Sequence, residues 1–353
     1  MRRGLISWAK TELPEAVFAM RVAQAQAAMA TDGLDAFVTY INITRPAAAS
    51  WFTGFVPYWS EGLMVLPRSG KPYLIVALSK RVQGWIEITA SVETVVSTPN
   101  FGLEAGKRIA AEKPAARVGV LELDTMPSGT MDALASGGAT LVDATALYRR
   151  LRDAADPAEI ALTTRAAEIA RDALATLDAN VGDAHAAIAT VERAARLAGA
   201  EDVFVALAPV LDRATAFRRA PFADTRLGDA FAIRLTLAYK GHWMRLVRTY
   251  ARAPERVAGI ALADARFADA IARLPDTAAL AAFEAWLVEG TTRSQPLEAL
   301  AGSSVAGSGI ALDGKLVSVT AIVTIDGRHY ATGGPAVVGS AWRPSALLVA
   351  PHA

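Results

Sequence analysis

The sequence predicts an α+β protein of two domains, a small α/β domain over residues 1–150 and a second domain over residues 151–353. A chain of 353 residues is long enough for two domains of ordinary size. The first half alternates helix-like and strand-like segments, which is typical of an α/β domain. The second half begins with two helical patterns and continues into paired strand patterns, which indicates a sheet with helices packed on it.

The composition excludes several classes of protein. Hydrophobic residues make up 53% of the chain and charged residues 20%, as in a packed globular protein. A net charge of +1 gives no support for a nucleic acid or a membrane surface as partner. The chain has no cysteine, so disulfides and thiolate chemistry are excluded. Lys10 and Glu12 interrupt the first segment too early for a secretory signal, and no apolar run approaches the roughly 18–20 residues that span a bilayer. We therefore expect a cytoplasmic protein.

The elements of the first domain follow from hydrophobic periodicity and turn residues. Apolar residues recur at helical spacing over residues 15–30, and the pattern stops at Asp32 and Gly33. Short apolar runs bounded by turn residues predict strands. The predicted elements are a helix at 15–30, strands at 34–40, 63–67, 73–77 and 118–121, and a short helix at 130–135.

A strong helix start marks the beginning of the second domain. Asp156 can cap the helix, Pro157 suits its first position, and Glu159 completes a capping box. The patterns downstream predict helices at 157–178, 183–198, 256–274 and 277–288, and strands at 203–210, 315–325, 328–332 and 336–339.

Residues 228–249 predict a β-hairpin that turns at Lys240 and Gly241. With these two as the loop, Tyr239 faces His242, Arg234 faces Val247 and Arg245 faces Thr236. Side chains alternate between the faces of a strand, so one face is apolar. The other face carries Arg234 and Arg245 roughly 7–8 Å apart at the backbone. Its members are Ala232, Arg234, Thr236, Trp243, Arg245, Val247 and Thr249.

This hairpin resembles that of the creatinase, aminopeptidase P and methionine aminopeptidase family, which includes Xaa-Pro peptidases. The family pattern is G-D, four residues, Asp, ten residues, Asp, and R-T three positions on. Gly228-Asp229, Gly241 and Arg248-Thr249 match it without a gap. Residues 33–36 (GLDA) and 51–55 (WFTGF) resemble the creatinase N-terminal domain. The resemblance implies a creatinase-like N-terminal domain followed by a pita-bread domain, a curved antiparallel sheet covered by helices.

The positions of the family's metal ligands carry other residues here. Arg234 and Arg245 stand where the two aspartates are expected, Ser308 where the histidine is, and Thr320 where a glutamate is. The last glutamate would fall near Gly333 or Gly334. A guanidinium offers no lone pair to a divalent cation and repels it. The resemblance therefore implies a degenerate metal site, and we expect no metal and no cofactor.

The candidate site residues divide into two groups. The substrate-binding candidates are Arg234, Arg245, Ser308, Thr320, Thr236 and Trp243. The catalytic candidates are Asp313, which follows the loop 307–312, and His329, which is the least implausible histidine base. Creatinase uses a histidine base upstream of its hairpin, but the matching segment here, residues 214–221, contains no histidine.

Two functions follow from this reading, and the sequence leaves both open. The first is a metal-independent, creatinase-like hydrolase or lyase of a small carboxylate-bearing C–N compound. The second is a non-catalytic pita-bread protein, a pseudoenzyme, that binds an anionic ligand, a peptide or a partner subunit, since arginine forks suit carboxylates and phosphates. The ligand positions argue against a conventional Xaa-Pro metallopeptidase. Alternatively, the arginines pair with acids such as Asp224, Asp229, Asp313 or Asp326. The resemblance also implies a homodimer.

Overall fold

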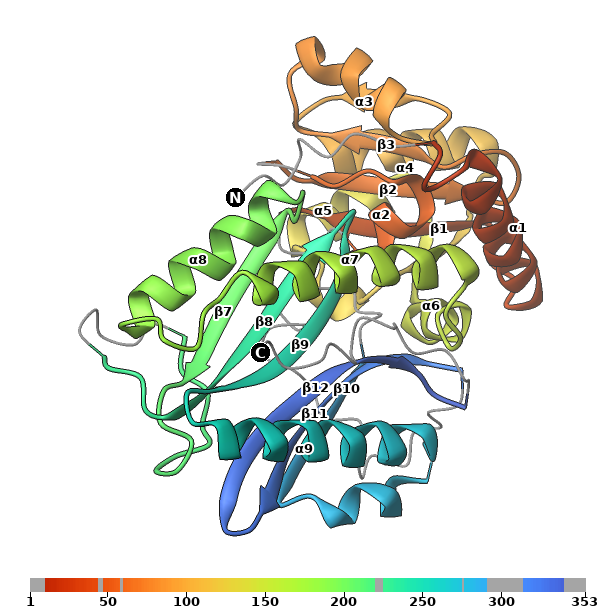
Figure 1. Ribbon diagram of the computed structural model, residues 1–353. Coiled ribbons are helices and arrows are strands. Elements are labelled where there is room, and N and C mark those ends of the chain that lie inside the picture. The colour runs from red at the N-terminus through yellow and green to blue at the C-terminus, as the bar shows by residue number, and fades with distance from the viewer. Residues whose placement is uncertain are drawn as a thin grey trace. The chain divides into compact units, whose positions relative to one another are not determined.

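The computed structural model describes residues 10–43, 47–57, 60–219, 225–274, 276–290 and 314–339 (Figure 1). The chain forms two compact units that divide between Asp153 and Ala154. Each unit has its own six-stranded sheet and its own apolar core. In the part of the chain that the structure describes, no helix has both the length and the apolarity needed to cross a bilayer.

The N-terminal unit is built on a mixed sheet with the strand order β4-β3-β2-β1-β5-β6. Strands β1, β2 and β3 pair antiparallel, whereas β4, β5 and β6 join parallel to their neighbours. The strands are β1 (Ala36–Ile41), β2 (Gly62–Pro67), β3 (Tyr73–Val76), β4 (Val95–Ser97), β5 (Arg117–Val120) and β6 (Thr140–Asp143).

Helices cover both faces of this sheet, because alternate residues of its strands point to opposite sides. On one side Phe37 and Met64 share an apolar cluster with residues of α1, α2 and α6. On the other side Val38 and Val65 pack with residues of α4 and α5. The helices are α1 (Glu15–Thr31), α2 (Ala47–Thr53), α3 (Gln83–Thr89), α4 (Phe101–Glu112), α5 (Ser128–Ala135) and α6 (Thr145–Leu151). The predicted α/β domain is confirmed.

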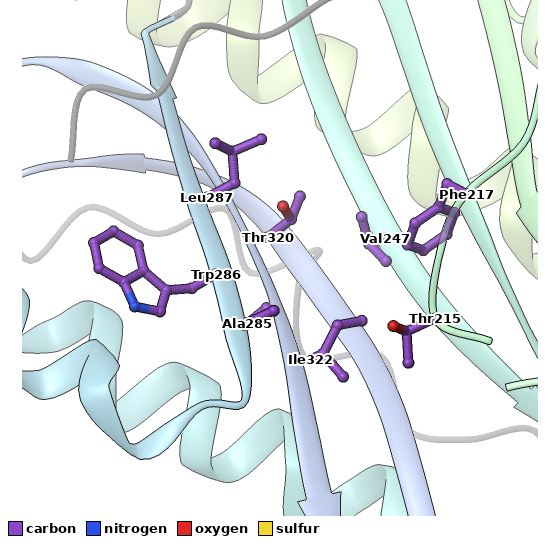
Figure 2. Close-up of a pocket in the computed structure, with 9 residues that line it drawn as sticks. Thr215, Phe217, Val247, Ala285, Trp286, Leu287, Thr320 and Ile322 are labelled. Atoms are coloured by element: carbon purple, nitrogen blue, oxygen red, sulfur yellow. The ribbon is translucent and has the colours of Figure 1, made fainter. Parts of the chain in front are cut away.

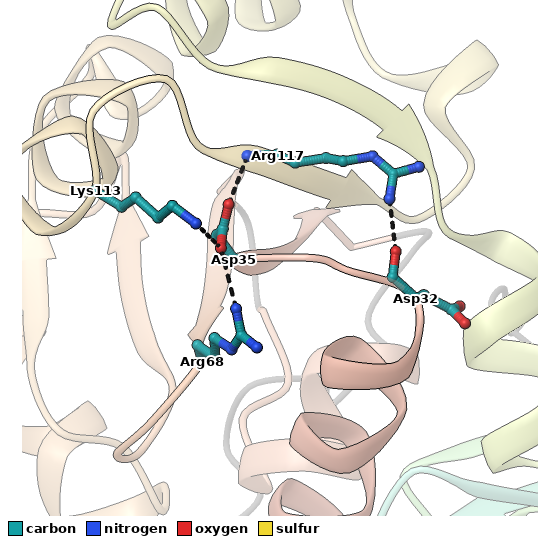
Figure 3. A network of polar contacts seen from close by, with 5 residues as sticks. All are labelled: Asp32, Asp35, Arg68, Lys113 and Arg117. Carbon is teal, nitrogen blue, oxygen red and sulfur yellow. Dashed lines mark hydrogen bonds and ion pairs between the residues drawn. The ribbon is translucent and has the colours of Figure 1, made fainter.

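A network around Asp35 ties the entry of β1 to its neighbours (Figure 3). The Asp35 carboxylate accepts a hydrogen bond from Lys113 Nζ at 2.7 Å and one from the backbone N–H of Arg117 at 2.9 Å, and Arg68 Nη1 lies 3.5 Å away. The hydrogen bond from Lys113 is the main reason that the pKa of Asp35 is lowered. Arg117 also donates to the backbone oxygen of Asp32 at 2.6 Å. These contacts hold the turn between α1 and β1 against β5.

The C-terminal unit has an antiparallel sheet with the strand order β10-β11-β12-β9-β8-β7. Its strands are β7 (Asp202–Ala208), β8 (Ala230–Tyr239), β9 (His242–Ala251), β10 (Ala285–Gly290), β11 (Leu316–Ile325) and β12 (Arg328–Val337). Its helices are α7 (Pro157–Ala175), α8 (Ala184–Leu197) and α9 (Pro254–Ala272). The antiparallel sheet with helices on it confirms the fold class expected from the resemblance.

All three helices pack on one face of this sheet, which we call the helix face. Phe231 and Leu235 of β8 share a core with residues of α7 and α8. Further along the same face, Thr332 of β12 donates to Asp264 of α9 at 2.7 Å. The capping box predicted at the start of α7 is present, since Asp156 accepts from the backbone N–H of Glu159 and Glu159 accepts from that of Asp156.

Two predictions in the C-terminal unit are wrong. Residues 277–288, predicted as a helix, form a short 3₁₀ helix (Thr277–Ala282) followed by strand β10. Pairing with β11 overrides the helical pattern there, because Trp286 and Leu287 stand opposite Ala321 and Thr320. The two strands predicted at 328–332 and 336–339 are one strand, β12, whose pairing with β11 runs through Gly333.

Candidate functional site

The pairing registers place five residues in one line across the sheet, which we call the cross-sheet row. Arg234 of β8 stands opposite Val247 of β9, and Val247 stands opposite Gly333 of β12. Gly333 stands opposite Thr320 of β11, and Thr320 stands opposite Leu287 of β10. Directly opposed residues share a sheet face, so the row lies on the face away from α7, α8 and α9. We call this side the arginine face.

The predicted hairpin register is confirmed at each of its three stated pairs. Tyr239 faces His242, Arg234 faces Val247 and Arg245 faces Thr236. Lys240 and Gly241 both have positive φ, of 51° and 78°, as a tight two-residue hairpin turn requires. Arg245 therefore lies on the arginine face two residues from the cross-sheet row, close to Arg234.

Arg245 is held firmly by its neighbours. Its side chain is 3% exposed, and its Nε donates to Thr236 Oγ1 at 2.9 Å. The backbone N–H of Arg245 donates to Ser318 Oγ of β11 at 3.2 Å. These contacts fix a positive charge inside the arginine face.

Arg234 is only half-buried, and it contacts an aromatic ring. Its Cζ lies 5.1 Å from the centroid of the Phe217 ring, which is the geometry of a cation–π contact. Phe217 comes from the segment after β7, where the backbones of Leu207 and Arg218 exchange two hydrogen bonds of 2.9 and 2.8 Å. That bridge brings Phe217 against the sheet.

A second aromatic group lies on the same face. Phe204 of β7 stacks on Trp243 with ring centroids 5.8 Å apart, and Arg219 Cζ lies 4.5 Å from the Phe204 centroid. Trp243, a predicted binding residue, is 7% exposed and is not among the residues that line the cavity described below. Phe204 and Trp243 form the end of the arginine face nearest the β8–β9 turn.

A cavity of about 190 Å³ lies next to Phe217 and Val247, two residues that neighbour Arg234 (Figure 2). Phe217 and Thr215 lie on one side of it, and residues of β10 and β11 lie on the other. Three members of the cross-sheet row, Val247, Thr320 and Leu287, line it. The full lining is Thr215, Phe217, Val247, Ala285, Trp286, Leu287, Thr320, Ala321 and Ile322.

Sequence reasoning missed most of this cavity. Thr215 and Phe217 lie in the segment that was searched for a histidine, and neither residue type signals a site on its own. Trp286 and Leu287 lie in the segment that was predicted to be helical. The one usable signal was the short apolar run 285–288, which ends at Glu289 and Gly290, since recognising a strand there would have placed Leu287 on the arginine face.

Of the two catalytic candidates, Asp313 and His329, only His329 lies in the described part of the chain. His329 lies at the end of the β11–β12 hairpin, where its Nδ1 is 3.0 Å from Glu284 Oε2 and 3.2 Å from Thr324 Oγ1. It is four residues from Gly333, or roughly 13 Å along the strand, so the structure does not bring it to the arginines. Asp313, Ser308 and Asp224 lie outside the described residues.

A buried acid supports the turn that ends the arginine hairpin. The Glu201 carboxylate accepts the backbone N–H groups of Lys240 and Gly241, the latter at 2.9 Å. Burial raises the pKa of Glu201 to about 7, although both hydrogen bonds oppose the shift.

The residues in the row do not suit the divalent cation that the family resemblance implies. Arg234, Arg245 and Thr320 supply no carboxylate or imidazole. A Cβ added to Gly333 would lie 2.5 Å from the Val319 carbonyl oxygen and 2.8 Å from the Thr320 Cα, so an acidic side chain does not fit there. Throughout the described ranges, no cluster of three or more His, Cys, Asp or Glu side chains could hold a metal.

This chain resembles known proteins in the sequence of its N-terminal domain and in its fold. Residues 21–154 match the creatinase/prolidase N-terminal domain. No curated protein matches the sequence significantly. Solved structures match almost the whole chain. Their sequence identities are low, so the likeness shows a common fold and no more.

Three of these structures illustrate the range of proteins with this fold. The Xaa-Pro dipeptidase from Bacillus anthracis superposes with a TM-score of 0.67 at 16% identity, over 92% of this chain and 95% of that one. The X-Pro aminopeptidase from Thermotoga maritima gives a TM-score of 0.67 at 17% identity, over 90% and 94%. The N-terminal domain of the FACT complex subunit SPT16 from Cicer arietinum gives 0.58 at 13% identity, over 95% and 98%.

The match to residues 21–154 and the likeness in fold along the chain confirm the resemblance seen in the sequence. Residues 21–154 thus form a creatinase/prolidase N-terminal domain, the C-terminal unit has the pita-bread fold, and the chain as a whole shares its two-domain fold with prolidases and Xaa-Pro peptidases.

Proposed function

We propose that the C-terminal unit binds a small organic anion on its arginine face without the help of a metal ion. The observation that carries this proposal is the arginine face, where Arg234 and Arg245 stand on the adjacent strands β8 and β9, with Thr320 further along the cross-sheet row. Two guanidinium groups there create a positive field that attracts carboxylates and repels cations. The half-buried Arg234 is the principal ligand contact, because Arg245 is already held by Thr236.

A carboxylate is the group that best fits this surface. The planar fork of an arginine can donate two parallel hydrogen bonds to a carboxylate. The Thr320 hydroxyl lines the cavity further along the row and can donate a hydrogen bond to another polar atom of the ligand. The likeness to a domain named as part of a complex subunit, and not as a peptidase, supports a binding role for this fold.

Metal-independent hydrolysis or lysis of a C–N compound is the catalytic form of the same proposal. Such a reaction needs a general base within hydrogen-bond reach of the reacting group. His329 lies roughly 13 Å along β12 from the row, and threonine hydroxyls are poor bases. Binding without turnover therefore fits the described residues better than catalysis.

Titration of N-acetylglycine, a small carboxylate-bearing C–N compound, into wild type and Arg234→Met tests the binding site. We expect Arg234→Met to weaken binding about 10- to 100-fold, since a hydrogen bond to a charged group contributes about 1.5–3 kcal/mol. Arg248→Met is the matched control, because it removes the same charge from the same hairpin but on the opposite face. Equal affinities of wild type and Arg234→Met, or equal weakening by Arg248→Met, would refute the proposal.

The same samples decide between binding and catalysis. Wild-type protein is incubated with N-acetylglycine and a chelator, and free glycine is measured over time. We expect saturable binding and no glycine release above the buffer rate. Chelator-resistant release that disappears in Arg234→Met would instead establish the metal-independent hydrolase.

A further inference from the structure

We infer that the ligand of this site is an aromatic or similarly bulky apolar carboxylate, whose ring occupies the cavity next to Phe217 and Val247. The inference rests on the proposed function for the anionic end of the ligand. It adds the chemical class of the other end, which the cavity between Phe217 and strands β10 and β11 determines.

The cavity and the arginine are parts of one site. Phe217 lines the cavity and also lies 5.1 Å from Arg234 Cζ, measured to its ring centroid. Val247 lines the cavity too, and it stands directly opposite Arg234 in the sheet. Arg234 does not itself line the cavity, so a ligand with its carboxylate at the Arg234 guanidinium would reach the cavity past Phe217 and Val247.

The volume of the cavity sets the size of the apolar group. An empty apolar cavity of about 150 Å³ is known to hold a benzene molecule. The cavity here measures about 190 Å³, which leaves room for one six-membered ring and a short link to the carboxylate. A methyl group would leave most of it unfilled.

The lining of the cavity sets the chemistry of the group. Val247, Leu287 and Ile322 present hydrocarbon surfaces, and Phe217 presents an aromatic one (Figure 2). Thr215 and Thr320 add two hydroxyls, which are neutral. No charged side chain lines the cavity, so a second charge on the ligand would find no ionic partner there.

Three related compounds test the inference by calorimetric titration: N-acetylglycine, N-benzoylglycine and N-benzoylglycinamide. Replacing the acetyl methyl by phenyl should tighten binding about 10- to 100-fold, as expected for burying one aromatic ring. Converting the carboxylate to the amide should remove most of that affinity, because the contact with Arg234 is lost.

A cavity-filling variant shows where the ring binds. Ala285 lines the cavity from the exposed side of β10, so Ala285→Phe can occupy the space without disturbing a buried core. We expect the affinities for N-benzoylglycine and N-acetylglycine to converge in Ala285→Phe and to stay separate in Ala285→Ser. Thermal melting of both variants checks that they are folded.

The outcomes separate this inference from the proposed function. Equal binding of N-acetylglycine and N-benzoylglycine to the wild type, both weakened by Arg234→Met, overturns the inference and leaves the anion site standing. An advantage for the phenyl compound that survives Ala285→Phe overturns it as well. Binding of the amide as tight as that of the carboxylate, or no binding of any compound, overturns both.

Discussion

The two arginines of the site have different roles because their surroundings differ. Arg245 is 3% exposed and hydrogen-bonded to Thr236, so its position is determined by the fold. Arg234 is half-buried against the Phe217 ring, so its guanidinium can still change partners. In the proposed site, Arg245 would supply a fixed charge and Arg234 would supply the hydrogen bonds to the ligand.

Gly259 shows how tightly a single residue constrains the C-terminal unit. A Cβ at this position would lie 2.1 Å from Tyr330 Oη and 2.3 Å from its Cζ. Tyr330 is 2% exposed, and the Arg256 guanidinium lies over its ring at 5.1 Å, so the ring has little room to move. The side chain of Tyr330 can pack against α9 because residue 259 is glycine.

We expect Gly259→Ala to lower the free energy of unfolding by about 1–3 kcal/mol, the usual cost of overpacking a core. Gly182→Ala is the control, because a Cβ at Gly182 would meet no atom within 4 Å. Urea denaturation of the three proteins measures the effect. Equal stability of Gly259→Ala and wild type would contradict the packing of Tyr330 on α9.

For single residues, the sequence predicted the features that depend on the alternation of side chains along a strand. The turn at Lys240 and Gly241 and the period of two were enough to pair Arg234 with Val247 correctly. The position of Phe217 depends on a backbone bridge between Leu207 and Arg218, which leaves no pattern in the sequence. The side of the cavity formed by Thr215 and Phe217 was therefore beyond prediction.

Among the elements, the β8–β9 hairpin depends on Glu201 for the support of its turn. Glu201 precedes β7 and reaches across to the two N–H groups of the turn. Its pKa is about 7 in the folded protein, whereas a carboxyl of this type ordinarily titrates near 4.5. The protonated form is thus favoured by folding.

The direction of the resulting pH effect follows from that difference. The contribution of Glu201 to stability is fully present below about pH 4.5 and is lost as the pH rises through about 7. We expect the wild type to lose about 3 kcal/mol of unfolding free energy between pH 5 and 8 relative to Glu201→Gln. Urea denaturation across this range measures the difference between the proteins. Parallel stability curves would show that Glu201 does not titrate there.

Strand β10 shows why one element escaped prediction. Residues 277–288 include alanines and leucines at helical spacing, and local propensity alone favours a helix. In the structure, residues 285–290 pair with β11 from the edge of the sheet, and this tertiary contact decides the outcome. Because Leu287 and Trp286 belong to β10, the error in the element also concealed part of the site.

For the molecule as a whole, the fold resembles that of Xaa-Pro peptidases, whereas the side chains of the cross-sheet row do not suit a divalent cation. The chain has the fold of prolidases and Xaa-Pro peptidases, yet the row that crosses its second sheet carries cationic and neutral side chains. The fold could be predicted because it depends on hydrophobic periodicity, capping and turns along the entire chain. The chemistry depends on a few positions. The sequence predicted which residues stand at the expected ligand positions, but it did not determine what those residues bind.

We expect the purified protein to retain well under one equivalent of manganese, zinc or iron after incubation with excess metal and desalting. The reason is that a divalent cation needs anionic or imidazole ligands, which the row does not supply. Elemental analysis measures the retained metal, and thermal melting with and without a chelator should give the same midpoint. One tightly held equivalent in the C-terminal unit would show that other residues provide ligands.

The junction between β9 and β12 gives the second sheet an unusual construction. There, Thr249 Oγ1 both donates to the carbonyl oxygen of Ala331 and accepts from its N–H, each at 2.8 Å. One hydroxyl thus takes the place of a peptide group in the pairing of β9 with β12. It joins two three-stranded halves of the sheet, β7-β8-β9 and β10-β11-β12, each of which contains a hairpin. Arg234 belongs to one half and Thr320 to the other, so a molecule that contacts both would link the two halves across the β9–β12 junction.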